Sequence, residues 1–355
     1  MSKTALRKRI EGGMAGAVIG DALGAMTETL SIRQIRHLYG WIDDFTELRH
    51  KPYDQDRVIG AYTDDASLVI AMAQSIIDSG DVELDAVVSH LMKWSSDPVL
   101  AKFSGPSTKR AVMRIAAGED PFLVGMGDVQ SFTGATNGGA MKSAPAGWFH
   151  PGDVAAAARA AAIICTPTHN TQLAIAGAAA VAGACAQACV EGTDITAIIE
   201  AAVEAAQIGE AIGLAQGREV AGPSIERRIL AAVEIARSGH DLESVVEDLA
   251  DQIGAGLNTH ESVPAAFGLL AAAGGDINLT AITAANIGDD TDTIGSIATA
   301  IAGTFSGIDK VNKDWYALVS TVNCIDIKGL AQKFTRVTEN NSLRSTQPKK
   351  AGSKS

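Results

Sequence analysis

The chain has 355 residues, enough for one large domain or two ordinary ones. It carries 29 Lys and Arg against 41 Asp and Glu, a net charge of −12, and no basic stripe runs outside its termini. This pattern argues against a partner held through a nucleic-acid backbone, so we expect no nucleic-acid partner. Because Ala and Gly dominate the middle of the chain and aromatic residues make up 5%, we expect an all-α protein.

The N-terminal segment superficially resembles a secretory signal, because basic residues precede an apolar stretch at residues 12–26. Glu11 and Asp21 interrupt that pattern. A second uncharged stretch, residues 173–190, consists mainly of Ala and Gly and is less lipophilic than a membrane-spanning helix requires. We therefore expect both stretches to be core helices of a cytoplasmic protein without a membrane partner.

Within the first stretch, four glycines recur at every fourth position: Gly12, Gly16, Gly20 and Gly24. On a helix this spacing places small residues on one face, so a neighbouring backbone can approach closely. We expect these glycines to serve packing.

Apolar residues recur with helical spacing along the chain, and no stretch resembles an interdomain linker. We expect one helical domain over residues 1–338. From about Glu339 polar and basic residues replace the apolar pattern, which predicts a disordered tail over residues 339–355.

The cysteines lack the paired spacing of a zinc site and are too few for a disulfide framework. We expect all of them to be reduced and buried: Cys165, Cys185, Cys189 and Cys324.

A first acidic cluster opens an apolar helix expected to begin near Ala66, and consists of Thr63, Asp64 and Asp65 after Tyr62. Taken alone, this cluster is explained as a helix cap. Thr is a good N-cap, and Asp in the first turn is favoured by the helix dipole.

A second cluster opens an apolar helix expected from Ile294 to Phe305, and contains Asp289, Asp290 and Asp292 with two threonines. Three carboxylates so close together repel one another and cannot all cap one helix, so their convergence would need a cation. Carboxylate and hydroxyl oxygens are the hard ligands that Mg²⁺, Mn²⁺ or Ca²⁺ prefer. Two such helix starts could meet across a bundle mouth and hold two ions roughly 3.5–4 Å apart.

The order of these motifs resembles the ADP-ribosylglycohydrolase family, which includes the dinitrogenase reductase-activating glycohydrolases. The resemblance rests on Gly20 to Gly24 with Glu28, Tyr62 to Asp65, Asn137 to Lys142 with Ala144 and Pro145, Thr168 with His169, and Gly288 to Thr293. These five motifs run in order through most of the chain. One departure is Asp289, which stands where the family usually has Gly and either adjusts the site or caps the helix.

The resemblance implies an all-helical orthogonal bundle with a dinuclear metal site in a central cleft. The two ions would be Mg²⁺ or Mn²⁺, with Asp292 near both. The implied ligands are Thr63, Asp64, Asp65, Asp290, Asp292 and Thr293.

The resemblance also implies substrate contacts at a glycine loop and at His169, which we expect to open a helix. The loop residues are Asn137, Gly138, Gly139 and Met141. The substrate would be an ADP-ribosylated protein or a small ribosyl compound. Trp148, Phe149 and His150 follow the loop and either stack on a base or cover a helix end.

Cleavage of an N-ribosyl bond passes through an oxocarbenium-like state and needs a positioned water. Two ions can orient ribose hydroxyls and lower the pKa of a bridging water, while Glu28 or Asp65 acts as base or acid. Three functions stay open: an ADP-ribosyl hydrolase, a nucleoside N-ribohydrolase on the same scaffold, and a non-catalytic module that binds ADP-ribose or metal.

Overall fold

The structure, a computed structural model, describes residues 2–50, 57–128 and 133–345, with side chains described as far as Leu343. Regular structure within these ranges is helical. They contain no strand, only two isolated β-bridges. The all-α fold expected from composition is confirmed.

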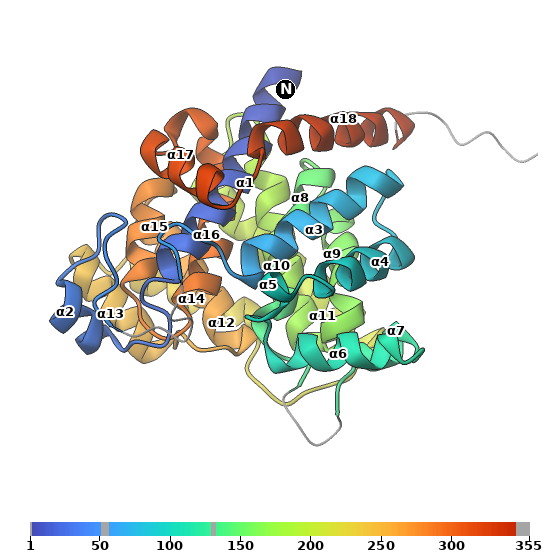
Figure 1. The fold of residues 1–355 in the computed structure, drawn as a ribbon, viewed down its shortest axis with the longest axis horizontal. Coiled ribbons are helices and arrows are strands. Elements are labelled where there is room, and N and C mark those ends of the chain that lie inside the picture. Colours follow the sequence, from blue (N-terminus) through green and yellow to red (C-terminus); the bar gives the residue numbers. More distant parts are fainter. Residues whose placement is uncertain (1, 51–56, 129–132, 346–355) are drawn as a thin grey trace, which may run out of the picture.

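The first nine helices are α1 (Lys3–Gly24), α2 (Ile32–Tyr39), α3 (Asp64–Ser79), α4 (Leu84–Ser95), α5 (Pro98–Ala101), α6 (Pro106–Ala116), α7 (Pro121–Gly125), α8 (Ala144–Phe149) and α9 (Val154–His169). The following nine are α10 (Gln172–Ala188), α11 (Ile195–Gln216), α12 (Ile225–Ala236), α13 (Leu242–Gln252), α14 (Thr259–Ala272), α15 (Ile277–Ala285), α16 (Thr291–Ser306), α17 (Lys313–Val322) and α18 (Ile327–Ser345). Short 3₁₀ turns are η1 (Asn137–Gly139) and η2 (Ile308–Lys310). Figure 1 shows their arrangement.

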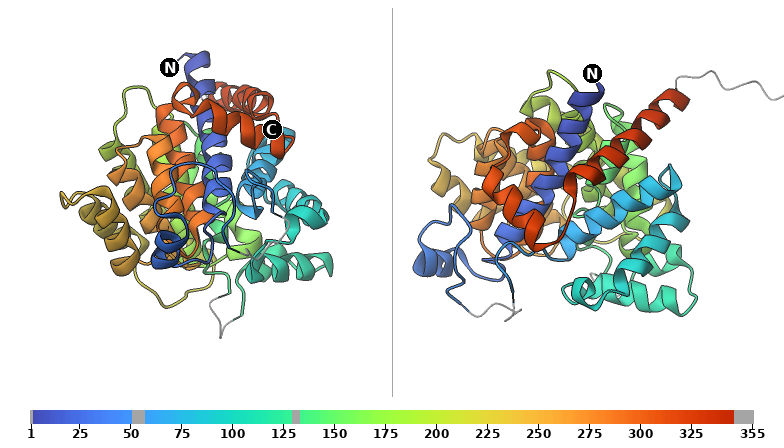
Figure 2. Two further views of the ribbon diagram at one scale, coloured as in Figure 1. Left: turned by 60° about the vertical axis from the view of Figure 1, so that its left-hand side comes forward. Right: turned by 45° about the horizontal axis from the view of Figure 1, so that its top comes forward.

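Helices α1 and α16 form the central antiparallel pair and lie side by side in Figures 1 and 2. The glycine face of α1 meets a matching row on α16. A Cβ on Gly12 would collide with the backbone of Gly303, and one on Gly24 with that of Thr291. The packing role predicted for the glycines is confirmed, because only glycine permits this backbone approach.

Hydroxyl groups on α16 reinforce this contact. Thr299 Oγ1 donates to the carbonyl of Gly16 at 2.6 Å, and Thr291 Oγ1 donates to that of Gly24 at 2.7 Å. Antiparallel packing places the C-terminal end of α1 against the N-terminal end of α16, where the second acidic cluster lies. The glycine spacing therefore brings the Gly20 to Gly24 motif against the second acidic cluster.

Helix α10 is buried along nearly its whole length and packs against α9 and α11. Its Ala and Gly residues keep it thin enough to be surrounded by other helices. No helix in the described ranges is both long and apolar enough to cross a membrane.

Trp148 and Phe149 lie in the core and are 0% exposed. Trp148 Nε1 donates to Thr304 Oγ1 at 2.8 Å, and both rings pack edge-on against Phe334. Of the two roles left open for them, covering a helix fits this burial and base stacking does not.

The C-terminal helix α18 continues seven residues beyond the boundary expected after residue 338, through Ser345. Thr338 is buried and its hydroxyl donates to the carbonyl of Trp148 at 3.4 Å, and Glu339 forms an ion pair with Lys3 at 3.1 Å. These contacts bind the helix to the rest of the molecule at the point where sequence alone predicts disorder. The remainder of the expected tail, residues 346–355, lies outside the described residues.

The cysteines are free, and three of them are buried as expected. Cys324 is exposed, so the prediction of burial is wrong there. It follows the end of α17 with a φ of 50°, in a turn on the surface.

Candidate active site

The carboxylate of Asp21 joins α1 to the start of α3. It accepts the backbone N–H of Thr63 through both oxygens, at 2.9 and 3.0 Å, and that of Ala66 at 2.8 Å. Sequence reasoning assigned Asp21 no role. Its role could have been inferred from its position, because it is a carboxylate within an apolar helix. Such a carboxylate, when buried, needs hydrogen-bond donors.

Thr63 is the N-cap of α3, and its hydroxyl oxygen accepts the backbone N–H of Asp65 at 3.3 Å. The cap moves the helix start to Asp64, two residues before the position expected from the apolar pattern. Asp64 and Asp65 therefore occupy the first turn, where the dipole favours negative charge. Thr63 itself is 1% exposed and lines a neighbouring cavity rather than the one between the acidic clusters.

A cavity of about 90 Å³ lies near the C-terminal end of α1 and the N-terminal ends of α3 and α16. It gathers most of the predicted site residues, from both clusters and the glycine loop. These residues are Glu28, Asp64, Asp65, Asn137, Gly138, Met141, His169, Asp290, Asp292 and Thr293. The lining also includes Phe103, Thr108, Thr136 and Leu257, which sequence reasoning did not single out.

The glycine loop is fastened to the second acidic cluster. Asn137 donates its side-chain N–H to the carboxylate of Asp290, and its backbone N–H to the carbonyl of Leu257 at 3.0 Å. Gly138 faces the ring of His169, where a Cβ would come within 2.8 Å of Cε1. Gly139 does not line the cavity, because it packs behind the loop against Cys165.

His169 is the last residue of α9, so the expectation that it opens a helix is wrong. Pro167 lies inside the final turn, and α10 begins after the Thr171 N-cap. The ring nevertheless reaches the cavity, as predicted. Burial, together with the nearby charge of Lys142, lowers the pKa of His169 well below its usual value.

The carboxyl groups of the two clusters raise one another's pKa. Burial and the charge of Asp292 raise the pKa of Asp64 to about 7, and those of Asp65 and Asp290 well above the usual range. For Glu28, the charge of Asp292 and then burial raise the pKa to about 8. Without a cation, this cluster thus holds protons that exposed carboxyls release.

Arg57 is the basic side chain beside Glu28, with Nη2 at 3.8 Å from the carboxylate. Its side chain is 5% exposed, and its guanidinium lies 5.2 Å from the centre of the Phe103 ring. This charge opposes the rise in the pKa of Glu28. Nothing in the local sequence pointed to Arg57, because it reaches Glu28 only through the fold.

Within the described ranges, no three Asp, Glu, His or Cys side chains are gathered as they would be around a metal ion. The dinuclear site therefore stays a prediction. Two features fit a hard cation: the cavity is lined by carboxylate and hydroxyl oxygens, and Asp65 Oδ1 is buried without a hydrogen-bond partner.

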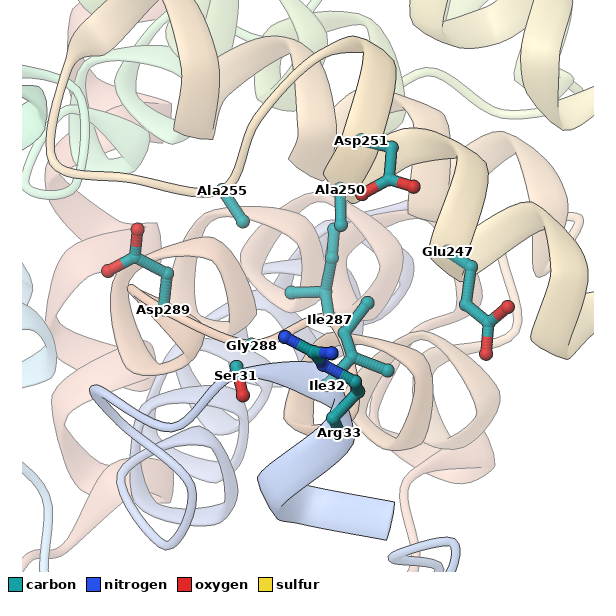
Figure 3. A pocket seen from close by; sticks show the side chains of 10 residues that line it. All are labelled: Ser31, Ile32, Arg33, Glu247, Ala250, Asp251, Ala255, Ile287, Gly288 and Asp289. Atoms are coloured by element: carbon teal, nitrogen blue, oxygen red, sulfur yellow. The ribbon is translucent and has the colours of Figure 1, made fainter.

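Asp289 shapes the turn before α16 and lies outside this cavity. Its φ is 59°, a region that Asp tolerates better than most residues. Its backbone N–H donates to the carbonyl of Leu30 at 2.9 Å, and its carbonyl accepts the N–H of Thr29 at 2.8 Å. Its side chain lines a separate groove of about 540 Å³. In Figure 3 it lies on the opposite side of this groove from Glu247.

Comparison with known proteins gives one consistent family. The sequence profile of ADP-ribosylglycohydrolase matches residues 2–344. The protein YegU of Escherichia coli (strain K12) is 31% identical over 341 residues, which cover 93% of this chain and 97% of that protein. Human ADP-ribosylhydrolase ARH3 is 25% identical over 348 residues, which cover 93% of each.

A solved structure described as an ADP-ribosylglycohydrolase-related protein complex shares the fold. Its TM-score is 0.66 at 21% identity, with 94% of this chain and 99% of that chain covered. The chain belongs to the ADP-ribosylglycohydrolase family, whose hydrolases act on glycosyl bonds.

Proposed function

We propose that this protein is a metal-dependent N-glycosyl hydrolase that cleaves the bond between the ribose of ADP-ribose and an acceptor. The observation that carries the proposal is the cavity in which Asp64 and Asp65 of α3 meet Asp292 of α16 and its N-cap Asp290, with Glu28 also in the lining. Carboxylates from distant parts of a chain are buried together at a cost, and catalysis is a common reason for retaining them.

Two divalent ions, Mg²⁺ or Mn²⁺, would be held by residues that line this cavity: Asp64, Asp65, Asp290, Asp292 and Thr293. Thr63 lines the neighbouring cavity and would join them through its hydroxyl, which lies 2.9 Å from Asp65 Oδ2. When bound, they would orient ribose hydroxyls and lower the pKa of the attacking water. Asp65 Oδ1 supports this assignment, because it is buried and accepts no hydrogen bond, so it is available to coordinate a cation.

Glu28 would take the proton from the attacking water, with Asp65 as the other candidate base. Arg57 would orient the Glu28 carboxylate through the pair at 3.8 Å. Asn137 is already hydrogen-bonded to Asp290, so the glycine loop that presents Gly138 would hold the substrate beside the acidic cluster.

The similarity to ADP-ribosylhydrolase ARH3 supports ADP-ribosyl compounds as the substrate class, either an ADP-ribosylated protein or a small ribosyl compound. The acceptor group lies beyond the ribose, so the acidic cluster does not select it. A panel of substrates is therefore needed to find the leaving group.

The test is to incubate the purified protein and its Asp292→Asn variant with Mg²⁺ or Mn²⁺ and ADP-ribosyl peptides, O-acetyl-ADP-ribose or nucleosides. We expect free ADP-ribose from one of the first two, no release after chelation, and strongly reduced release by the variant. Release of ribose from nucleosides alone would instead support a nucleoside N-ribohydrolase. Binding of ADP-ribose with no product from any substrate would support the non-catalytic alternative.

A further inference from the structure

A buried chain of hydrogen bonds runs behind the cleft from Lys142 to Thr136. Lys142 Nζ lies 2.8 Å from Thr168 Oγ1, that oxygen lies 2.8 Å from His169 Nδ1, and His169 Nε2 lies 2.9 Å from Thr136 Oγ1. Lys142 and His169 are 1% exposed and Thr168 is 2% exposed, whereas Thr136 is half-buried and lines the cavity. The chain thus joins a fully buried cation to the wall of the cleft.

The direction of this chain follows from what each group can donate. An ammonium group has hydrogens to give and no lone pair, so Thr168 Oγ1 accepts from Lys142. The single hydrogen of the Thr168 hydroxyl is then free for His169 Nδ1. No other partner of this hydroxyl is present among the residues that the structure describes.

A hydrogen bond donated in the opposite direction, from His169 Nδ1 to Thr168 Oγ1, is unfavourable. If His169 carried its hydrogen on Nδ1 and donated it to Thr168, the hydroxyl hydrogen of Thr168 would be buried with no acceptor, which folded proteins avoid. With Nδ1 as the acceptor, the neutral ring carries its hydrogen on Nε2 and donates it to Thr136 Oγ1.

Burial and neighbouring charges are consistent with the protonation states that this hydrogen-bond direction requires, a neutral His169 and a charged Lys142. Burial and the charge of Lys142 lower the pKa of His169 well below its usual value, so the ring is neutral near pH 7. Burial lowers the pKa of Lys142 to about 8, while the nearby Cys165 and Asp64 act in the opposite sense. Lys142 therefore remains mostly an ammonium group near neutral pH.

We propose that this chain fixes Thr136 as a hydrogen-bond donor to the ligand, and that Lys142, Thr168 and His169 are positioning residues that set this direction. Thr136 Oγ1 accepts from His169 Nε2, and no acceptor for its own hydrogen is present among the residues that the structure describes, so this hydrogen is available to the cleft. An acceptor oxygen of the ribosyl compound would satisfy it. The identity of this ligand rests on the proposed function.

Lys142 has a second effect on the same wall. Its Nζ donates to the carbonyl of Gly138 at 2.6 Å, so one buried cation holds both the glycine loop and the hydroxyl that directs His169. Lys142 thereby fixes the position of the glycine loop relative to the histidine ring. Thr136 directly precedes this loop and contacts the ring.

The first test reads the tautomer of His169 in the ligand-free protein. Long-range ¹H–¹⁵N spectra of protein labelled with ¹⁵N-histidine distinguish the two neutral forms, and the His169 signal is identified by its loss in His169→Gln. We expect the Nε2–H form in the natural sequence and in Thr168→Ser, and loss of this single form in Thr168→Val. The proposal is overturned if the natural sequence carries Nδ1–H, or if Thr168→Val leaves the tautomer unchanged.

Thr166→Val is the matched control, because it removes another buried hydroxyl from α9. Thr166 Oγ1 donates to the carbonyl of Ala162 at 2.7 Å and takes no part in the chain. We expect this variant to retain the Nε2–H form. A change of tautomer in Thr166→Val would show that the His169 ring responds to general loosening of α9 and would remove the argument from direction.

The second test measures the contact with the ligand. Calorimetric titration with ADP-ribose in the presence of Mg²⁺ compares Thr136→Ser with Thr136→Val. We expect affinity within about twofold of the natural sequence for Ser and a loss of about tenfold for Val, as for one hydrogen bond. Equal affinity in the Val variant would exclude Thr136 as a ligand contact. If the natural sequence neither binds ADP-ribose nor releases it, the proposed function fails, while the tautomer result still decides the direction of the chain.

Discussion

Asp21 and Thr63 lie 42 positions apart in the chain and are joined by a carboxylate that accepts one backbone N–H through both of its oxygens, at 2.9 and 3.0 Å. The first acidic cluster owes its position beside α1 to this bond. Every carboxyl group that α3 brings to the cleft follows Thr63 within two residues. Asp21 is thus a structural prerequisite of the site, although it does not line the cavity.

We expect Asp21→Ala to leave the backbone N–H groups of Thr63 and Ala66 buried without acceptors. The free energy of unfolding should fall by about 2–6 kcal/mol, since each of these two groups costs about 1–3 kcal/mol. Denaturant titration measures the loss. Asp194→Ala is the control, because Asp194 is an exposed N-cap that accepts the N–H of Ala197, and its removal should cost only about 1 kcal/mol. Equal losses in the two variants would contradict the role given to Asp21.

The stability of the metal-free protein should fall as the pH rises from about 4 to 8. Burial and neighbouring charge raise the folded-state pKa of Asp21 and Glu28 to about 8 and that of Asp64 to about 7. The folded state therefore binds more protons than the unfolded state between the unfolded pKa values, near 4, and these raised values, so stability is lost across that interval.

Added Mg²⁺ or Mn²⁺ should reduce this loss, because cations replace the protons in the folded state. Melting temperatures measured from pH 4 to 8, with chelator and then with each ion, check the expectation. A metal-free profile that rises or stays flat over this interval would contradict the electrostatic description of the cleft.

Asp292→Asn should have opposite effects on metal binding and on the metal-free fold. The charge of Asp292 raises the pKa of Asp64, Asp65, Asp290 and Glu28, so its removal relieves repulsion and should stabilise the protein in chelator. Metal affinity, measured by calorimetry, should fall by at least about tenfold, because a ligand charge is lost. Asp289→Asn is the neighbouring control and should retain affinity, since Asp289 lies outside the cavity. Two ions bound to Asp292→Asn with unchanged affinity would return this cluster to the role of a helix cap.

Glu28→Gln preserves size but cannot accept a proton, so a general base at this position predicts a loss of about 10²–10⁴-fold in single-turnover rate. Affinity for ADP-ribose and the number of bound ions should change much less. Glu47→Gln, an exposed carboxylate in the segment that follows α2, serves as the control. A near-normal rate for Glu28→Gln would leave Asp65 as the candidate base.

Gly20→Ala should force the central helices apart, because its Cβ would meet the side chain of Thr299 and the backbone of Gly295. We expect a destabilisation of about 1–3 kcal/mol, typical of overpacking, and weaker metal binding as the helix ends separate. Gly105→Ala is the control, since nothing lies within 4 Å of a Cβ at Gly105. Similar stability of the two variants, measured by denaturant titration, would contradict the close approach.

Local patterns predicted the all-α fold, the glycine face of α1, the Thr63 cap of α3 and the helix that follows the second cluster. They worked because helix caps and four-residue spacing depend on neighbours in the chain. The pairing of Arg57 with Glu28 and the bond from Asp21 to Thr63 could not be predicted in this way, because each joins residues that only the fold brings together. The expectation that His169 opens a helix rests on the family resemblance, whereas the structure ends α9 at His169 and accommodates Pro167 within its last turn.

The antiparallel contact between α1 and α16 also determines when, during translation, the cleft can form. Thr291 bonds to Gly24, 267 positions earlier, so α1 leaves the ribosome long before its partner exists. At about 5–20 residues per second, the interval is on the order of 10–50 s. During that time the glycine face of α1 has no helix to cover it, and the cleft cannot form, because the acidic residues of α16 have not yet been made. Each molecule therefore acquires its candidate active site only after residues 290–293 have been made and have reached α1.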